Sequence, residues 1–235
     1  MPNSLVIASR PTKRQRTRYK NRPRYSHSGR YEPMRSTPQN QMSQYLSRNN
    51  PFPAVEYATL RYVQRVTVTP QANGSSGYHS FRATSIHDPD FSGIVNGGQP
   101  YGHDAYQGIY KHYKVLSSTC SVQALSSHSS DFAGFGINVD QDSSFQDDPR
   151  WLMASKGSTY TLASQQQSQR VLSRSYNCNY FRDQSALTAN FGSDPDQDFF
   201  FRIFTITDKT SRDIECVVTI NYRVQMWGVA DLSIT

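Results

Sequence analysis

The chain has 235 residues and a formal net charge of +7, with 25 Lys and Arg against 18 Asp and Glu. Residues 1–35 carry ten basic side chains and one acidic side chain (10 − 1 = +9), whereas residues 36–235 carry 15 basic and 17 acidic ones (15 − 17 = −2). This distribution excludes a uniformly basic domain and predicts a cationic arm joined to a near-neutral body.

The arm lacks the apolar side chains that a core requires. Pro11, Pro23, Pro33 and Pro38 interrupt any helix. Ordering the backbone would cost roughly 1–2 kcal/mol per residue, with little apolar burial to offset it. We therefore expect an unfolded arm over 1–35, a polar linker over 36–55 and one folded domain over 56–235.

The composition of the arm favours nucleic acid as its partner. Arg outnumbers Lys eight to two in residues 1–35, and the guanidinium group matches phosphate geometry. Tyrosines between the charges can stack on unpaired bases. The arm residues predicted to bind nucleic acid are Arg10, Lys13, Arg14, Arg16, Arg18, Tyr19, Lys20, Arg22, Arg24, Tyr25, Arg30 and Arg35.

Other readings of the arm fit less well. A membrane-surface helix needs an apolar face, which only Leu5, Val6 and Ile7 offer. The prolines and the dense charge disfavour a mitochondrial transit peptide, and alternating or acidic residues would serve solubility as well. Lys13, Arg14 and Arg16 also match the short basic pattern of a nuclear localisation signal, although an Arg-rich arm matches such a pattern by chance.

Alternation of apolar and polar residues predicts the strands of the body. In residues 215–227 the even positions from Cys216 to Met226 are apolar, and Thr219, Asn221, Arg223 and Gln225 occupy the other face. A period of two over this length is typical of a half-buried strand. Eight strands are predicted, over 56–69, 78–86, 113–125, 131–140, 157–164, 169–179, 199–207 and 215–227. Two helices are predicted in connections, over 102–110 and 147–154.

The connections favour a particular arrangement of these strands. Long connections of about 26, 16 and 19 residues alternate with short ones such as "NGSSG". Eight antiparallel strands joined in this way predict an all-β jelly-roll sandwich. The strand over 199–207 is apolar on both faces, so its outer side needs cover from another layer or another chain. The 15 Tyr and 12 Phe indicate either subunit interfaces or a well-filled core.

One stretch of the body resembles a known family. The residues from His87 to Gln123 carry an Asp-Pro-Asp, Gly-x-Asp-x-Tyr and Tyr-x-x-Tyr-x-Val pattern that is similar to capsid proteins of circular, Rep-encoding single-stranded DNA viruses (circovirus-like). The matching positions are Asp88, Pro89, Asp90, Pro100, Gly102, Asp104, Tyr106, Tyr110, Tyr113 and Val115. The final "VTINYRVQMWG" also resembles the last strand of that family. The resemblance implies a single jelly roll, a small helix before the third strand and a basic arm that lines the interior of a shell.

The neighbouring first and last strands of a jelly roll suggest a second cationic site. Arg61, Arg65 and Arg223 lie on the polar faces of these strands. If that sheet faces the shell interior, the three side chains add to the nucleic-acid-binding set. Ordinary solvent-facing arginines are the alternative interpretation.

The sequence shows no pattern of an enzyme, a metal site or a cofactor site. The six His are scattered, and phosphate-binding, dinucleotide-binding and nucleophile-elbow motifs are missing. Cys120, Cys178 and Cys216 fall within predicted strands and are expected to be buried free thiols, with Cys120 and Cys216 near each other on the core face of two neighbouring strands. The acidic stretches "DQDSSFQDD" and "DPDQD" could take Ca²⁺ at subunit contacts, but neither has EF-hand spacing and acidic loops are usually solvated. We read the His87–Asp90 stretch as a turn.

We therefore predict a viral coat protein that assembles into an icosahedral shell of about 60 copies. Its expected partners are further copies of itself and a single-stranded genome, with DNA favoured over RNA by the resemblance, and no membrane. A nuclear import receptor and a cell-surface receptor are possible host partners. The expected locations are the virion and, during infection, the host nucleus. The alternative is a cellular nucleic-acid-binding β-sandwich that forms no shell; the net charge of −2 on the body argues against it.

Overall fold

The computed structural model describes residues 51–71, 75–93, 98–125, 134–142, 148–162, 171–206 and 213–230. The whole arm and residues 36–50 of the linker lie outside the described residues. The predictions made for them, including the domain boundaries, stay predictions.

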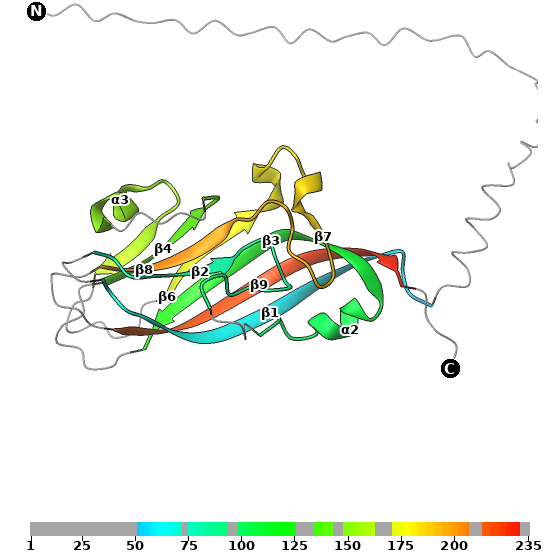
Figure 1. Cartoon of the computed structure of the whole chain (residues 1–235), viewed down its shortest axis with the longest axis horizontal. Coiled ribbons are helices and arrows are strands. Elements are labelled where there is room, and N and C mark those ends of the chain that lie inside the picture. The colour runs from blue at the N-terminus through cyan, green and yellow to red at the C-terminus, as the bar shows by residue number, and fades with distance from the viewer. Residues whose placement is uncertain are drawn as a thin grey trace, which may run out of the picture. The chain divides into compact units, whose positions relative to one another are not determined.

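The described residues form two packed antiparallel sheets (Figure 1). The first sheet has the order β1 (Val55–Val68), β9 (Ile214–Val229), β3 (Tyr110–Ala124) and β6 (Val171–Asn177), with β7 (Thr188–Asn190) also paired to β3. The second sheet has the order β2 (Tyr78–Arg82), β8 (Phe200–Ile206), β4 (Gly134–Asp140) and β5 (Thr159–Leu162). In each sheet, strands from the two ends of the chain alternate, which is the jelly-roll arrangement. The predicted fold class is confirmed.

Short helices lie in the connections where they were predicted. Helix α2 (His103–Gln107) stands between β2 and β3, and α3 (Pro149–Ala154) between β4 and β5. The Asp148 carboxylate accepts a hydrogen bond from the backbone NH of Arg150, and Pro149 occupies the first turn, so α3 has a regular N-terminus. Two 3₁₀ turns that were not predicted, η2 (Cys178–Tyr180) and η3 (Ser185–Leu187), follow β6.

The long pairing of β1 with β9 follows the predicted alternation. Leu60, Tyr62, Val66 and Val68 of β1 are buried, as are the even positions of β9 from Ile214 to Met226. Their polar neighbours point away from the second sheet. Because the side-chain period is two, this register places the buried residues of both strands on the core side, whereas Val55, Tyr57, Val63, Val217 and Trp227 lie on the outer side with the polar residues.

Polar side chains connect the two sheets through the core. The Tyr222 hydroxyl of β9 donates to the carbonyl of Arg82 in β2 at 2.7 Å, and the Ser118 hydroxyl of β3 donates to the carbonyl of Ala83 at 2.7 Å. Ser118 faces inward because the register of β3 shifts at Leu116, between Val115 and Ser117. Five of the tyrosines are buried in this core: Tyr62, Tyr110, Tyr113, Tyr176 and Tyr222. A third of the 15 tyrosines therefore belongs to the core.

The second sheet has a cover on its outer side. All seven residues of β8 are buried, and Leu152 of α3 packs on Phe204 and Ile206. Phe204 lies over Gly136 of β4, where an added Cβ would stand 2.2 Å from the phenyl ring. The cover that the apolar β8 required is thus supplied, within the described residues, by the chain's own helix.

Several predicted strand limits were wrong for local reasons. The second strand ends at Arg82 and not at residue 86, because Ser85 turns the chain by accepting from the backbone NH of His87. Cys178 lies in η2 and not in a strand, since Asn177 caps that turn by accepting from the NH of Asn179. Strand β7 was missed because three residues are too short to show alternation.

The cysteines are free and buried, as predicted. Cys120 and Cys216 lie on the core faces of the paired strands β3 and β9, but Cys120 is opposite Ile220 and Cys216 is opposite Ala124. Four residues along a strand span about 13 Å, so the two thiols are not in contact. Burial raises the pKa of both thiols. No helix among the described residues is long and apolar enough to span a membrane.

Candidate nucleic-acid interface

The three candidate arginines of the body lie on one surface. Arg61 and Arg65 of β1 and Arg223 of β9 are exposed and point away from the core. Arg61 is opposite Asn221, and Arg223 is opposite Thr59, so Arg61 and Arg223 are diagonal neighbours on adjacent strands. The predicted grouping of these side chains on one face is confirmed; their binding of nucleic acid stays a prediction.

The three arginines differ in their surroundings. Arg65 forms an ion pair with Glu215 of β9. In the strand register Glu215 is opposite Thr67, the next outward residue of β1 after Arg65. Within the described part of the chain, neither Arg61 nor Arg223 has a carboxylate at ion-pair distance. A phosphate would therefore compete with Glu215 at Arg65 but not at the other two sites.

Strand register extends this surface across the whole first sheet, and we call it the polar sheet face. Its members are the outward residues of the four main strands, none of which is fully buried. They are Val55, Tyr57, Thr59, Arg61, Val63, Arg65 and Thr67 of β1, Glu215, Val217, Thr219, Asn221, Arg223, Gln225 and Trp227 of β9, His112, Lys114, Ser117, Thr119, Ser121 and Gln123 of β3, and Val171, Ser173, Ser175 and Asn177 of β6.

The charge on the polar sheet face is uneven. It carries Arg61, Arg65, Lys114 and Arg223 against Glu215, so its net charge is 4 − 1 = +3 with His112 neutral. The remaining positions are mainly Ser, Thr, Asn and Gln, which can donate hydrogen bonds to phosphate oxygens. A near-neutral body therefore presents one cationic face.

Sequence reasoning missed four members of this face. Tyr57, His112, Lys114 and Trp227 share it with the arginines. Tyr57 and Arg61 are four residues apart in β1, so the alternation of the strand already predicted that both side chains lie on the same face. His112 was missed because the predicted start of the third strand came three residues too late, whereas Lys114 lay within the predicted strand but was not assigned to the site.

Two of the three acidic residues of "DPDQD", Asp194 and Asp198, pair with Arg82. Arg82 Nε donates to Asp198 Oδ2 at 3.0 Å and Nη1 to Asp88 Oδ2 at 2.9 Å, while Asp194 Oδ2 lies 3.5 Å from Nη2. Burial raises the pKa of the Asp198 carboxyl, although a hydrogen bond from Thr84 and the charge of Arg82 act against this. Through Arg82, Asp194 and Asp198 thus hold their segment against β2. Among the described residues, no group of three or more His, Cys, Asp or Glu is arranged to hold a metal ion.

Asp90, which was read as part of a turn, is a core residue. It is 3% exposed, and its carboxylate contacts His79 Nε2 at 2.6 Å and accepts from Gln64 Nε2 at 2.7 Å. Its backbone forms an isolated bridge with Phe81 of β2. Asp88 and Asp90 of the capsid-like motif therefore hold the segment after β2 against the sandwich.

Comparison with known proteins finds similarity at the level of structure only. No family model matches the chain, and no curated protein matches it. The capsid protein of BFDV in a 60-mer crystal structure has 12% sequence identity and a TM-score of 0.43, with 78% of this chain and 100% of that chain covered. The cocksfoot mottle virus structure has 11% identity and a TM-score of 0.48, with 74% and 97% covered. A virus-like particle of the Macrobrachium rosenbergii nodavirus has 9% identity and a TM-score of 0.45, with 78% and 100% covered.

Proposed function

We propose that this protein is a viral coat protein whose copies close into an icosahedral shell around a single-stranded genome. The observation that carries the proposal is the combination of a jelly-roll strand order with an arm of net charge +9 before the first strand. The jelly roll is a recurrent fold of viral shells. An arm with a high density of positive charge and several prolines is suited to bind a polyanion that has no fixed conformation.

In this proposal the arm and the polar sheet face act together inside the shell. About 60 copies would bring roughly 60 × 9 = 540 arm charges to the genome. The polar sheet face would form part of the inner wall, where Arg61 and Arg223 meet phosphates that the arms leave free. Because the contacts are to phosphate, sequence preference would be slight.

Three finer parts of the proposal concern the genome and the host. The sequence resemblance favours single-stranded DNA over RNA as the genome. The motif Lys13-Arg14-Gln15-Arg16 would direct the subunit to the nucleus through an import receptor. Contact with a cell-surface receptor would fall to the exterior of the shell.

A second candidate function is a cellular nucleic-acid-binding β-sandwich that forms no shell. The observation that favours it is the exposed Tyr57, which is 56% accessible and lies on the same face as Arg61 and Arg223. An aromatic side chain beside cations is typical of proteins that bind single strands without a shell. The two functions differ in their assemblies, since the sandwich would remain a monomer or a small oligomer.

Assembly of the purified chain separates these functions. A coat subunit should form uniform closed particles in negative-stain images and elute as a very large species, because repeated symmetric contacts close on themselves. A monodisperse monomer at high concentration, across several salt and pH conditions, would exclude the shell.

Nucleic-acid content of the particles tests the two cationic sites. Deleting residues 1–35 should leave a folded sandwich but remove most packaged nucleic acid, measured from the absorbance ratio at 260 and 280 nm. Replacing Arg61, Arg65 and Arg223 by Gln should lower the content without stopping assembly. Arg150→Gln is a control for the loss of one surface charge, to be compared with the single variants Arg61→Gln and Arg223→Gln, because Arg150 is 87% exposed on α3 and away from the polar sheet face. Unchanged content in the triple variant would leave these three as ordinary solvent-facing arginines.

A reporter fusion tests the cellular address. A fluorescent protein carrying residues 1–35 should accumulate in the nucleus, and replacing Lys13, Arg14 and Arg16 by Gln should return it to the cytoplasm. A uniform signal from the intact arm would remove the nuclear role while leaving packaging untouched.

A further inference from the structure

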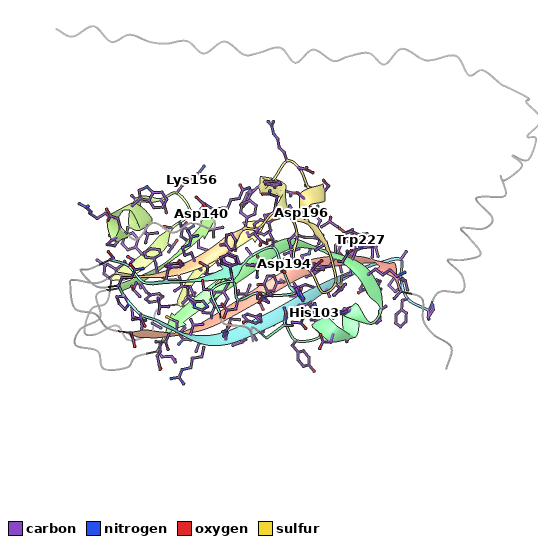
Figure 2. The ribbon with its side chains drawn as sticks, viewed as in Figure 1. His103, Asp140, Lys156, Asp194, Asp196 and Trp227 are labelled. Atoms are coloured by element: carbon purple, nitrogen blue, oxygen red, sulfur yellow. The ribbon has the colours of Figure 1, made fainter. Side chains whose placement is uncertain are left out.

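Aromatic side chains gather at one end of the polar sheet face. Trp227 of β9 is paired with Val55 on one side and with His112 of β3 on the other. The His112 and Trp227 rings lie 5.9 Å apart between centroids and are inclined by 30°. Tyr57 is opposite Gln225, one outward position away from Trp227, so the two aromatic side chains are diagonal neighbours. Figure 2 shows Trp227 near one end of β9, at the opposite end of the view from Asp140 and Lys156.

Local contacts fix the orientation of this group. The imidazole Nδ1 of His112 lies 2.7 Å from the side-chain oxygen of Asn190, and Gln225 Nε2 donates to the Tyr57 hydroxyl at 3.3 Å. Gly228 follows Trp227 with a φ of 71°, and a Cβ there would stand 2.8 Å from His112 Cδ2. A side chain at position 228 would therefore displace the His112 ring from its place beside Trp227.

The surroundings of the aromatic group favour an anionic ligand with flat rings. Lys114 is paired with Gln225 in the row beside Trp227, and Arg61 and Arg223 follow along β1 and β9. The one carboxylate among the described residues of this face, Glu215, lies twelve positions from Trp227 along β9 and is paired with Arg65. Residues 1–35, with their +9 charge, precede the strand that begins at Val55, the partner of Trp227.

We propose that Trp227 and Tyr57, with His112 supporting the indole ring, form a stacking site for unpaired bases of single-stranded nucleic acid. The bound strand places bases on the two aromatic rings and directs its phosphates towards Lys114, Arg61 and Arg223. This inference rests on the proposed binding of a single-stranded genome and adds a base contact to it. Every base has a flat face, so the site accepts any sequence but requires bases that are not paired.

The two tryptophans of the chain provide a matched test. In the full-length Trp151→Phe variant, Trp227 is the only tryptophan; in Trp227→Phe, the only one is Trp151, which lies on α3 against the other sheet. Each variant is titrated with an oligothymidylate of about 15 nucleotides and with an abasic oligonucleotide of equal length and charge. Binding is followed by anisotropy of a labelled oligonucleotide and by tryptophan emission.

The expected result is quenching of Trp227 by the oligothymidylate alone, with Trp151 unaffected by either probe. At raised salt, where phosphate contacts are weak, Trp227→Ala should lower affinity for the oligothymidylate by about five- to one-hundred-fold and leave the abasic probe unchanged. Bound oligothymidylate without quenching of Trp227, or equal quenching by both probes, would overturn the stacking site while leaving the packaging proposal standing. Failure of both probes to bind would overturn the two proposals together.

Discussion

Buried polar side chains hold the segment after β2 against the sandwich. Asp90 contacts His79 and Arg82 binds Asp88, which the turn after β2 brings together, whereas the contacts of Asp90 with Gln64 and of Arg82 with Asp198 join this turn to distant segments. A buried carboxylate is costly unless it is hydrogen-bonded, so removing Gln64 or His79 would take from Asp90 one of the two side chains that offset this cost. Asp88 and Asp90 thus contribute to stability through their carboxylates.

At the residue scale we expect Asp90 to make stability dependent on acid. Burial alone would raise the pKa of Asp90, but hydrogen bonds from His79 and Gln64 and the charge of His79 hold it below its usual value. A depressed folded-state pKa contributes stability that is present above the unfolded pKa of about 3.9 and is lost as pH falls through the folded value. Asp90→Asn should cost about 1–3 kcal/mol at pH 7, and less below pH 4.

Urea unfolding at several pH values measures this effect. Asp196→Asn is the control, because Asp196 is exposed and makes no ion pair among the described residues. A difference between Asp90→Asn and the wild type that stays constant from pH 7 to pH 3 would contradict this account of Asp90.

At the scale of elements, α3 covers part of the outer side of the second sheet. Strand β8 is buried on both faces because Leu152 packs on Phe204 and Ile206, while Phe201 and Ile203 point into the main core. A strand that is buried on both faces belongs in a sheet that is covered on both sides, and β8 meets this condition although it also contains Arg202 and Thr205. One and a half turns of helix therefore prevent an exposed apolar strip at the centre of this sheet.

A pair of leucines tests the role of this helix. Leu152→Ala should destabilise the domain by about 2–5 kcal/mol, because it leaves a cavity over β8. Leu162→Ala in β5 should cost far less, since Leu162 is 58% exposed and Leu152 is fully buried. Thermal unfolding of both variants measures the difference, and equal losses would show that α3 does not cover β8 in solution.

At the scale of the whole molecule, charge is divided between an arm of +9 and a sheet face of +3. If both bind single-stranded nucleic acid, the arm contributes more than the polar sheet face to the salt dependence of the affinity, because it carries more charges. Binding through phosphates releases about 0.7 counterion per charge on a single strand, so the salt dependence reports how many charges engage.

We expect a log–log slope of affinity against salt near −6 for full engagement of the arm. Raising salt from about 50 to 200 mM should then weaken binding by nearly four decades. The three net charges of the polar sheet face correspond to a further slope of about −2, so the intact chain should reach about −8 if both sites engage, and the chain without residues 1–35 should keep only about −2. Anisotropy titrations of the two chains measure both slopes, and identical slopes would show that the arm does not contact the phosphates.

The sequence by itself determined which side of each long strand is buried. The alternation in β1 and β9 is complete enough that the outward positions of Arg61, Arg65 and Arg223 followed without a structure, and so did the separation of a cationic arm from a near-neutral body. These properties are local, because a period of two or a count of charges needs only neighbouring residues. The jelly-roll class followed from the number of strands and the lengths of their connections.

Only the tertiary structure decided which side chains meet across the fold. Arg82 and Asp198 are separated by 116 residues, and Trp227 and His112 by 115, and no local pattern predicts either contact. The same is true of the cover that Leu152 gives to Phe204 and of the interior place of Asp90. Alternation states which face a side chain takes, but strand order and register decide what lies beside it, because both depend on how distant segments pack.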